Sequence, residues 1–282
     1  MKHFESVTLP AETFDPFWQS IVAPRGIKEA LLGYARIILS LDGASPLSTG
    51  INRFLYFFGP PGTGKTTLAK GFANQLAKAA KEYGHSTQLF HANAECWRSE
   101  LFGATAKEIT KAFEAIRVAT ADGLTLLLID ELESVAIGRE YTLTSHEPSD
   151  AISGVNTLLN ELDSLASNKN FLLLATSNFE QAIDRALRSR ADLEIYLTPP
   201  GYEGALSILK DTYMGIRSAG LDLCLTERQL SAIARKAEGL SGRSLRKLFI
   251  QVLSATHKPL DQIGAEDFFE VITQLKRSVK GG

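Results

Sequence analysis

A glycine-rich stretch of this sequence has the spacing of a loop that binds phosphate. It follows the apolar run Phe54–Phe58 and reads Gly59-Pro60-Pro61-Gly62-Thr63-Gly64-Lys65-Thr66, which fits G-x-x-x-x-G-K-[S/T]. Glycines let backbone N–H groups curve around phosphate oxygens, and the N-terminus of a following helix adds partial positive charge. We expect Lys65 to reach the β- and γ-phosphates of ATP and Thr66 to hold Mg²⁺, with Thr67 closing the nucleotide-binding segment. A plain turn before a helix would not explain Lys65-Thr66 at this position.

Two carboxylates at the end of another apolar run could complete this chemistry. Leu126–Ile129 is followed directly by Asp130 and Glu131. At the tip of a strand, Asp130 can coordinate Mg²⁺ directly or through water, and Glu131 can then polarise the attacking water as a general base. A strand that simply leaves the core can also end in Asp-Glu. The phosphate loop upstream makes us favour the catalytic interpretation.

A polar amide and two arginines could supply the remaining groups that phosphoryl transfer needs. Asn178 follows the apolar run Phe171–Ala175, where it can hold the water or sense the γ-phosphate, although asparagine after a strand is often only a turn residue. The charge that develops on the γ-phosphate needs a cation in addition to Lys65. The candidates are Arg185, Arg188 and Arg190, acting from a neighbouring subunit, and Arg243 and Arg246 of the C-terminal part. We favour Arg190 and Arg243, although surface arginines are ordinarily solvated or weakly paired.

These groups need a sheet whose strands end at a common edge. Short apolar runs typical of strands cover Phe54–Phe58, Thr87–His91, Leu124–Ile129, Phe171–Thr176 and Leu193–Leu197. Helical periodicity covers Ile27–Leu41, Thr66–Lys81, Ala104–Thr120 and Asp150–Leu165. Helices that alternate with continuously apolar strands predict an α/β fold, with a parallel sheet between helices.

The pattern changes at Pro199-Pro200-Gly201. Beyond it only helical periodicity remains, in Glu203–Ser218, Thr226–Glu238, Ser241–His257 and Ala265–Val279. We therefore expect a short, irregular N-terminal extension over residues 1–20, a large α/β ATPase domain over 21–198 and a small, all-helical lid domain over 199–282.

The composition excludes several other classes of protein. A net charge of -2 over 282 residues gives no global argument for nucleic acid or a membrane as partner. The two cysteines, Cys96 and Cys224, lack C-x-x-C spacing, which argues against a zinc site and fits a reducing cytoplasm. The apolar runs are too short to cross a bilayer, and the first residues do not read as a secretory signal. We expect a cytoplasmic protein without direct nucleic-acid binding.

The order of these motifs resembles the AAA+ superfamily, over about residues 20 to 280. GTPases would show an N-K-x-D motif, and in ABC ATPases the L-S-G signature precedes the Asp-Glu pair, whereas Leu240-Ser241-Gly242 follows it. More specific segments resemble the pachytene-checkpoint AAA+ ATPases, which remodel HORMA-domain proteins. These segments are Glu147-Pro148-Ser149-Asp150-Ala151, Arg190-Ala191-Asp192 and Leu240-Ser241-Gly242-Arg243.

This resemblance implies roles for several residues. The arginine of R-A-D acts in trans in that family, which corresponds to Arg190, and the arginine of L-S-G-R is the sensor of the small domain, which corresponds to Arg243. The adenine-binding segment corresponds to Ile21, Val22 and Ala23. The family also implies a hexamer.

The resemblance further implies a client. Eukaryotic members carry an N-terminal domain that recruits substrate, whereas about 20 residues precede the ATPase module here. In this respect the chain is similar to compact bacterial relatives encoded in CBASS anti-phage operons. There, the family implies a HORMA-domain client that the ATPase partly unfolds and dissociates from a cyclic-oligonucleotide synthase, which restrains the anti-phage signal.

A loop between the second expected strand and its helix could grip a threaded chain. It is Trp97–Gly103, and we expect its pore contacts from Leu101, Phe102 and Gly103. An aromatic side chain at the start of a helix can equally pack in the core. The polar segment Gly138–Glu147 could form a second pore element or a solvated linker.

Other functions of such a motor stay open at this point. A loader that acts on a DNA-associated complex predicts an ATPase stimulated by DNA. An activator that pulls on a metabolic enzyme shares the mechanism and differs only in its client. A scaffold that binds ATP only to assemble would not need Glu131, Asn178 and Arg190.

Overall fold

The structure is a computed structural model that describes most of the chain. The described residues are 4–41, 50–97, 104–119, 123–136, 148–166, 168, 170–179, 183–221 and 223–280. They divide into two compact units. The first unit comprises residues 1–21, 25–59 and 65–197, and the second comprises residues 22–24, 60–64 and 198–282.

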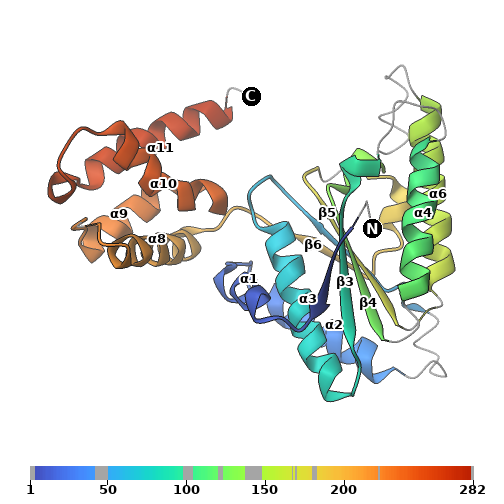
Figure 1. Ribbon diagram of the computed structural model, residues 1–282. Helices are drawn as coiled ribbons and strands as arrows, with labels where there is room; N and C mark the ends of the chain where they lie inside the picture. Colours follow the sequence, from blue (N-terminus) through green and yellow to red (C-terminus); the bar gives the residue numbers. More distant parts are fainter. Residues whose placement is uncertain are drawn as a thin grey trace. The chain divides into compact units, whose positions relative to one another are not determined.

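The first unit is built on a twisted sheet. The described strands form a six-stranded sheet in the order β1-β3-β4-β5-β2-β6 (Figure 1). Their bounds are Glu5–Leu9 (β1), Phe54–Phe58 (β2), Thr87–Asn93 (β3), Leu124–Asp130 (β4), Phe171–Ser177 (β5) and Leu193–Tyr196 (β6). Strands β2 to β6 are mutually parallel, and β1 pairs antiparallel to β3 at one edge. The expected α/β fold with a parallel sheet is confirmed, with this antiparallel edge strand added.

Burial explains why the middle strands are continuously apolar. Every residue of β2 and β5 is buried, because helices cover both faces of the sheet (Figure 1). One core cluster joins alternate residues of β2, β4 and β5 to the facing side chains of two helices, Ala104–Ala119 (α4) and Pro148–Ala166 (α6). The other face packs against Lys65–Glu82 (α3), next to Ile27–Ser40 (α2). All four helices agree with the expected ranges to within one or two residues.

Residues 5–20 form a strand and two short helical segments, so the expectation that this part of the chain is irregular was wrong. After β1, the chain forms a short helix, Asp15–Ser20 (α1), that packs on α3. Asn74 of α3 holds the connecting segment, since its side chain accepts from the Ala11 N–H at 2.9 Å and donates to the Ala11 carbonyl at 3.1 Å. A Cβ on Gly71 would lie 2.8 Å from the Trp18 backbone nitrogen, so the close approach of α1 requires glycine. Strand β1 is too short for its period-2 pattern to stand out in the sequence.

The second unit is helical. Its helices are Tyr202–Ser218 (α8), Glu227–Lys236 (α9), Gly242–Ala255 (α10) and Ala265–Lys280 (α11). All of these were expected, with boundaries shifted by at most a few residues. The polar N-caps mark where two of them begin, because Thr226 accepts from the Gln229 N–H and Ser241 accepts from the Ser244 N–H.

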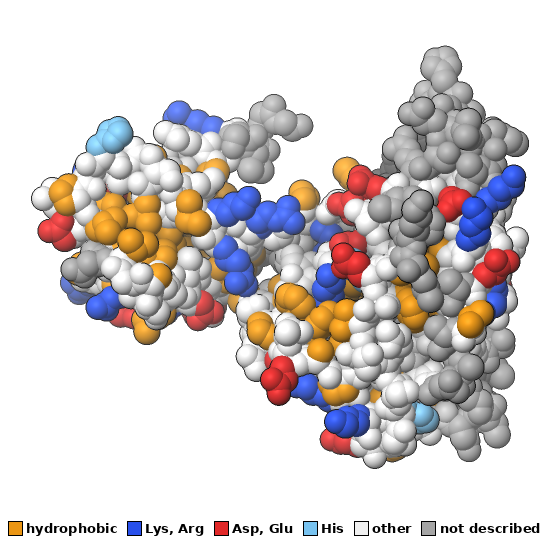
Figure 2. Space-filling view, viewed as in Figure 1, with side chains coloured by type: hydrophobic (Ala, Val, Ile, Leu, Met, Phe, Trp, Pro, Cys, Tyr) orange, Lys and Arg blue, Asp and Glu red, His pale blue; other side chains and the backbone are white. Residues whose placement is uncertain are grey.

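The surface of the second unit is partly apolar. Figure 2 shows apolar side chains gathered on its visible face, and its exposed large apolar residues are Met214, Leu221 and Ile250. Among the described helices of the whole chain, none combines the length and apolar character that a membrane span needs. The shorter elements are the helix Arg185–Arg188 (α7) and the 3-10 turns Glu12–Phe14 (η1), Ala94–Trp97 (η3), Leu132–Ser134 (η5) and Leu260–Gln262 (η6).

Candidate active site

The glycine-rich loop has a backbone that only glycine adopts without strain. Gly59, Gly62 and Gly64 have φ angles of 137°, 78° and 98°. At Gly59 a side chain is excluded twice, because an added Cβ would also lie 2.2 Å from the Leu197 carbonyl oxygen. The motif therefore determines a curled backbone whose N–H groups can face an anion.

Lys65 begins α3 and is buried, with 6% of its surface exposed. Its ammonium group donates a hydrogen bond to the carbonyl oxygen of Gly59 at 2.9 Å. The Lys65 ammonium is thus held beside Gly59, where the glycine-rich loop begins. This arrangement suits a phosphate group, because the negative charge of a phosphate attracts an ammonium at the start of a helix.

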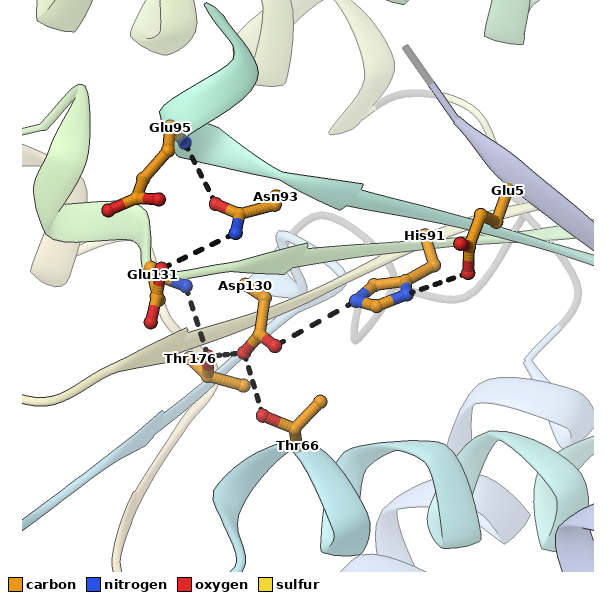
Figure 3. Close-up of polar contacts among 8 residues, drawn as sticks. All are labelled: Glu5, Thr66, His91, Asn93, Glu95, Asp130, Glu131 and Thr176. Carbon is orange, nitrogen blue, oxygen red and sulfur yellow. Dashed lines mark hydrogen bonds and ion pairs between the residues drawn. The ribbon is translucent and has the colours of Figure 1, made fainter. Parts of the chain in front are cut away.

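Asp130 is the centre of a cluster of oxygen atoms at the carboxyl ends of the strands (Figure 3). Its Oδ1 accepts from the Thr66 hydroxyl at 2.7 Å and from the Thr176 hydroxyl. Burial by itself would raise the pKa of Asp130, but the nearby His91 together with hydrogen bonds from Thr176 and Thr66 outweighs burial and lowers the pKa. The carboxylate therefore stays ionised, and together with the Thr66 hydroxyl it offers the hard oxygen ligands that Mg²⁺ requires.

His91 of β3 lies between two carboxylates (Figure 3). Its Nε2 is 3.8 Å from Asp130 Oδ2, and its Nδ1 is 3.8 Å from Glu5 Oε2 of β1. Both distances are too long for a hydrogen bond, and Nε2 is buried without a hydrogen-bond partner among the described residues. We therefore treat the effect of His91 on Asp130 as mainly electrostatic.

Glu131 has an unusual backbone conformation directly after β4. Its φ and ψ angles are 56° and 49°, in the left-handed region that residues with side chains rarely adopt. Its N–H donates to Thr176 Oγ1 at 3.3 Å, and its carboxylate accepts from the Asn93 side-chain amide at 3.4 Å (Figure 3). Strain of this kind persists where surrounding contacts enforce it. Here it turns the Glu131 carboxylate toward the end of β3, beside Asp130.

Asn178 is positioned by a buried acid. The Asn178 N–H donates to Glu133 Oε1 at 3.0 Å, while the Asn178 side chain is half-buried. Glu133 lies in η5, two residues after Glu131, and only 9% of it is exposed. Its second oxygen, Oε2, is buried and has no hydrogen-bond partner among the described residues. The segment after β5 is therefore hydrogen-bonded to η5, the turn that follows Asp130 and Glu131.

Arg190 is paired within its own chain. Its Nε and Nη2 donate to the two carboxylate oxygens of Asp163 at 2.7 and 2.9 Å, and Nη1 donates to the Ala186 carbonyl at 2.8 Å. Hydrogen bonding to Asp163 raises the pKa of Arg190, and the same pair lowers the pKa of Asp163. The pair lies at the surface of α6, with the Asp163 side chain 55% exposed.

Asp192 fixes the backbone that follows Arg190. Its carboxylate accepts from the Tyr34 hydroxyl at 2.7 Å, from the Asn52 N–H at 2.9 Å and from the Phe54 N–H at 3.3 Å. The Asn52 side-chain amide also donates to the Arg190 carbonyl at 3.0 Å. The R-A-D segment is thereby held against the start of β2.

The second unit contains Arg243 and part of the glycine-rich loop. The Arg243 N–H donates to the Gly62 carbonyl at 3.1 Å, at the N-terminus of α10. A Cβ on Gly62 would lie 2.8 Å from Ser241 Oγ and 3.1 Å from Arg243 Cβ. The loop residues 60–64 therefore pack closely on the L-S-G-R segment, and Arg243 itself is exposed.

The structure brings together some of the expected site residues and not others. Thr66, Asp130 and Glu131 meet at one edge of the sheet. In the expected adenine segment, Ile21 is buried in the first unit, and Val22 packs in the second unit against Gly204. Ala23 belongs to the second unit as well. The expected pore residues Leu101, Phe102 and Gly103 and the segment 138–147 lie outside the described residues.

Several residues of the cluster were missed in the sequence. They are Thr176, Asn93, His91 and Glu133. Only their position in the sequence could have indicated these residues. Polar residues at the carboxyl ends of adjacent parallel strands meet at the same edge of the sheet. Asn93, for example, lies opposite Asp130 in the register of β3 and β4. The order of the strands, which this argument needs, was not known from the sequence.

The fold and the site define a class of protein. A parallel sheet, a phosphate loop between β2 and α3 and an acidic strand end at β4 characterise a P-loop nucleotide-binding protein. The chain belongs to the AAA family, the ATPase family associated with various cellular activities, whose model matches residues 55–199.

Comparison with known proteins narrows the resemblance. The chain is 36% identical to the pachytene checkpoint protein 2 homolog of Arabidopsis thaliana, over 97% of this chain and 66% of that protein. It is similar to the solved structure of C. elegans PCH-2, with a TM-score of 0.79, 26% identity and coverage of 99% of this chain and 76% of that one. A chain of the solved E. coli MS115-1 HORMA:CdnC:Trip13 complex shares the fold, with a TM-score of 0.77, 18% identity and coverage of 97% and 95%. The chain spans 60% to 66% of the length of the first curated relatives it matches.

Proposed function

We propose that this chain is a ring-forming ATPase that uses ATP hydrolysis to remodel a protein client. The observation that carries the proposal is the cluster in which Asp130 accepts from Thr66 and Thr176, with Glu131 beside it. Membership of the AAA family supports nucleotide hydrolysis as its chemistry. We also propose the domain boundaries expected from the sequence, which place the ATPase domain between residues 21 and 198 and the helical lid domain after residue 198.

The residues of the first unit divide the chemical work. Lys65 and the loop Gly59–Gly64, with Thr67, bind the phosphates, and Thr66 and Asp130 hold Mg²⁺. When bound, Mg²⁺ neutralises charge on the β- and γ-phosphates. Glu131 accepts the proton of the attacking water, and Asn178 orients that water.

The proton acceptor is restrained before it acts. The Asn93 amide, at 3.4 Å, and the strained backbone of Glu131 hold its carboxylate at the edge of the sheet. A carboxylate that is fixed in place needs little reorganisation in the transition state. Thr176 contributes by contacting both the metal ligand Asp130 and the Glu131 N–H.

The arginines complete the site from other elements. We assign Arg190 as the residue that acts in trans on the nucleotide of a neighbouring copy, and Arg243 as the sensor of the second unit. Ile21, Val22 and Ala23 contact the adenine. Because Arg190 is paired to Asp163 in this chain, it must exchange that carboxylate for a phosphate when copies assemble.

The client we propose is a HORMA-domain protein. The similarity to pachytene checkpoint protein 2 homologs and to a chain of the HORMA:CdnC:Trip13 complex supports it. In this proposal the ring is a cytoplasmic hexamer that grips its client through Leu101, Phe102 and Gly103. It partly unfolds the client, dissociates it from a cyclic-oligonucleotide synthase and so restrains anti-phage signalling.

The first experiment tests the proton acceptor. Glu131→Gln should bind ATP with wild-type affinity and lose nearly all hydrolysis, because the amide cannot accept the proton. Glu95→Gln, whose side chain is exposed on neighbouring η3, is the matched control and should hydrolyse normally. ATP turnover in Glu131→Gln within a few-fold of wild type would remove Glu131 from this role.

The second experiment tests the shared site. Arg190→Ala should bind ATP and fail to hydrolyse it, whereas Lys65→Ala should fail to hydrolyse ATP because it cannot bind the phosphates. Mixing the two variants should restore part of the activity, because some interfaces then combine an intact phosphate loop with an intact Arg190. Arg188→Ala, which removes the pair with Glu194 and the contact with the Phe58 ring but leaves Arg190 in place, is the control. Absence of rescue at every mixing ratio would contradict a site shared between copies.

The third experiment tests the client. The ATPase rate is measured alone, with a HORMA-domain protein and with DNA. Stimulation by the HORMA-domain protein, lost in Phe102→Ala, supports the proposed function and the pore segment. Stimulation by DNA instead would favour a loader. No stimulation by either would leave an ATPase with a different protein client.

A further inference from the structure

A cavity of about 200 Å³ lies in the first unit, away from the phosphate loop. It is found at the amino-terminal ends of the parallel strands, where Leu124 begins β4 and Asn170 precedes β5. Asp130 ends the same strand β4, so the cavity and the Asp130 cluster are separated by the strand's length, about 20 Å. The two sites are therefore distinct.

The lining of the cavity combines apolar side chains with polar ones, among them one buried cation. Ile38 and Leu39 of α2 and Leu124 provide apolar side chains, while His85 and Asn170 are polar residues at its exposed rim. The cation is Arg53, of which only 6% is exposed. Apolar side chains beside a few polar groups that can fix the orientation of a ligand are typical of sites for small organic molecules.

Within the part of the chain that the structure describes, the guanidinium of Arg53 lacks the partners that a buried arginine normally has. Among the described residues it makes no hydrogen bond, although a guanidinium carries five N–H donors. The nearest carboxylate, that of Asp192, already accepts from Tyr34, Asn52 and Phe54. Burial lowers the pKa of Arg53, and Tyr34 and Asp192 oppose this shift only through their electrostatic field. The guanidinium nitrogens are not among the fully buried atoms that lack a partner, and Arg53 lines the cavity, so water or a ligand in the cavity can accept from them.

The backbone of Arg53 is a second indication. Its φ angle is 56°, in the region that favours glycine, yet the residue carries a long side chain. The conformation is enforced by its neighbours, since the Leu173 N–H donates to the Arg53 carbonyl at 2.8 Å and Asp192 binds the amides on either side. Strained residues of this kind cluster at sites that bind ligands.

We propose that this cavity binds a small organic anion that has one carboxylate and a compact apolar body. The carboxylate pairs with the Arg53 guanidinium, whose planar fork matches its two oxygens. The apolar body contacts Ile38, Leu39 and Leu124. A cavity of about 150 Å³ accommodates benzene, so 200 Å³ provides room for an aromatic ring with a carboxylate attached.

The experiment titrates the full chain with three probes by ligand-observed NMR. Benzoate has the charge and the ring, benzyl alcohol has the ring alone, and acetate has the charge alone. Benzoate should bind most tightly of the three. Arg53→Gly should weaken benzoate binding by about 10-fold to 100-fold, the range of a charge-assisted hydrogen-bond pair, and leave benzyl alcohol unchanged. Glycine suits the backbone angle at this position, so this variant should fold.

Two further variants keep the test decisive. Leu39→Trp fills the cavity while it retains Arg53, and it should abolish binding of benzoate. Arg36→Ala removes an exposed arginine of α2 and should change nothing. No binding of benzoate to the wild type, or equal binding to Arg53→Gly, would overturn the proposal and leave water as the partner of Arg53. The readout is binding rather than ATP hydrolysis, so the result is independent of the proposed motor activity.

Discussion

Replacing Asp192 by alanine should destabilise the first unit substantially. The carboxylate accepts from the hydroxyl of Tyr34, which is 7% exposed, and from the Asn52 and Phe54 N–H groups. A hydrogen bond from a buried hydroxyl to a carboxylate contributes about 2 kcal/mol, and the two partly exposed backbone bonds add about 0.5 kcal/mol each. The buried Arg53 also loses its nearest negative charge. We expect a decrease of about 3 kcal/mol in the free energy of unfolding.

The measurement is urea unfolding followed by tryptophan fluorescence. Both tryptophans, Trp18 and Trp97, belong to the first unit, so the signal reports on that unit. Tyr34→Phe removes the hydrogen bond from the buried hydroxyl and should cost about 2 kcal/mol. In a double-mutant cycle Tyr34→Phe and Asp192→Ala should be coupled by at least about 1 kcal/mol, because they remove the same bond.

The control separates this role from the loss of any aspartate. Asp163→Ala removes an exposed ion pair with Arg190 and should cost less than about 1 kcal/mol. If Asp192→Ala were within about 0.5 kcal/mol of the wild type, or if its effect were additive with that of Tyr34→Phe, the hydrogen-bond argument would be refuted.

Two further predictions concern packing and pH. Gly71→Ala should destabilise the first unit by about 1–3 kcal/mol, because an added Cβ would lie 2.8 Å from the Trp18 backbone. Gly33→Ala, at a position of α2 with no neighbouring atom within 4 Å, should instead stabilise the unit by up to about 1 kcal/mol. Thermal unfolding that ranks the two variants the other way would contradict this packing. In the second unit, hydrogen bonding from Lys258 and the Gly264 N–H lowers the pKa of Asp267. The contribution of Asp267 to the free energy of unfolding is therefore present above the unfolded pKa of about 3.9, and it is lost as the pH falls through the lower folded pKa. The difference in stability between wild type and Asp267→Asn, followed by far-UV circular dichroism, should therefore shrink only in acid; a constant difference down to pH 2 would argue against it.

The elements of this protein could be predicted closely because their signals are local. Strand Phe54–Phe58 was expected with its observed bounds, since a continuously apolar run followed by glycine and proline is typical of a buried strand. The helices of the second unit follow from their apolar periodicity and polar caps. The phosphate loop could be located in the same way, because its glycines and Lys65-Thr66 are contiguous.

The edge strand β1 could not be predicted from local sequence patterns. Its five residues are mostly exposed, so they carry little apolar alternation. The strand exists because β3 offers an unpaired edge that the start of the chain can reach, with Ser6 opposite Phe90 and Thr8 opposite Gln88. That edge is a property of the folded sheet and not of residues 5–9.

The sequence by itself determined the fold class, the phosphate loop and the candidates Asp130 and Glu131, because each depends on neighbouring residues. Only the tertiary structure decided that Thr176 joins Asp130, that Asp163 pairs with Arg190 and that Arg53 lines a cavity. These contacts join residues that are distant in the chain, and they depend on the order in which the strands pair. Many strand orders are compatible with the same local apolar patterns, and the packing of the whole sheet selects one of them.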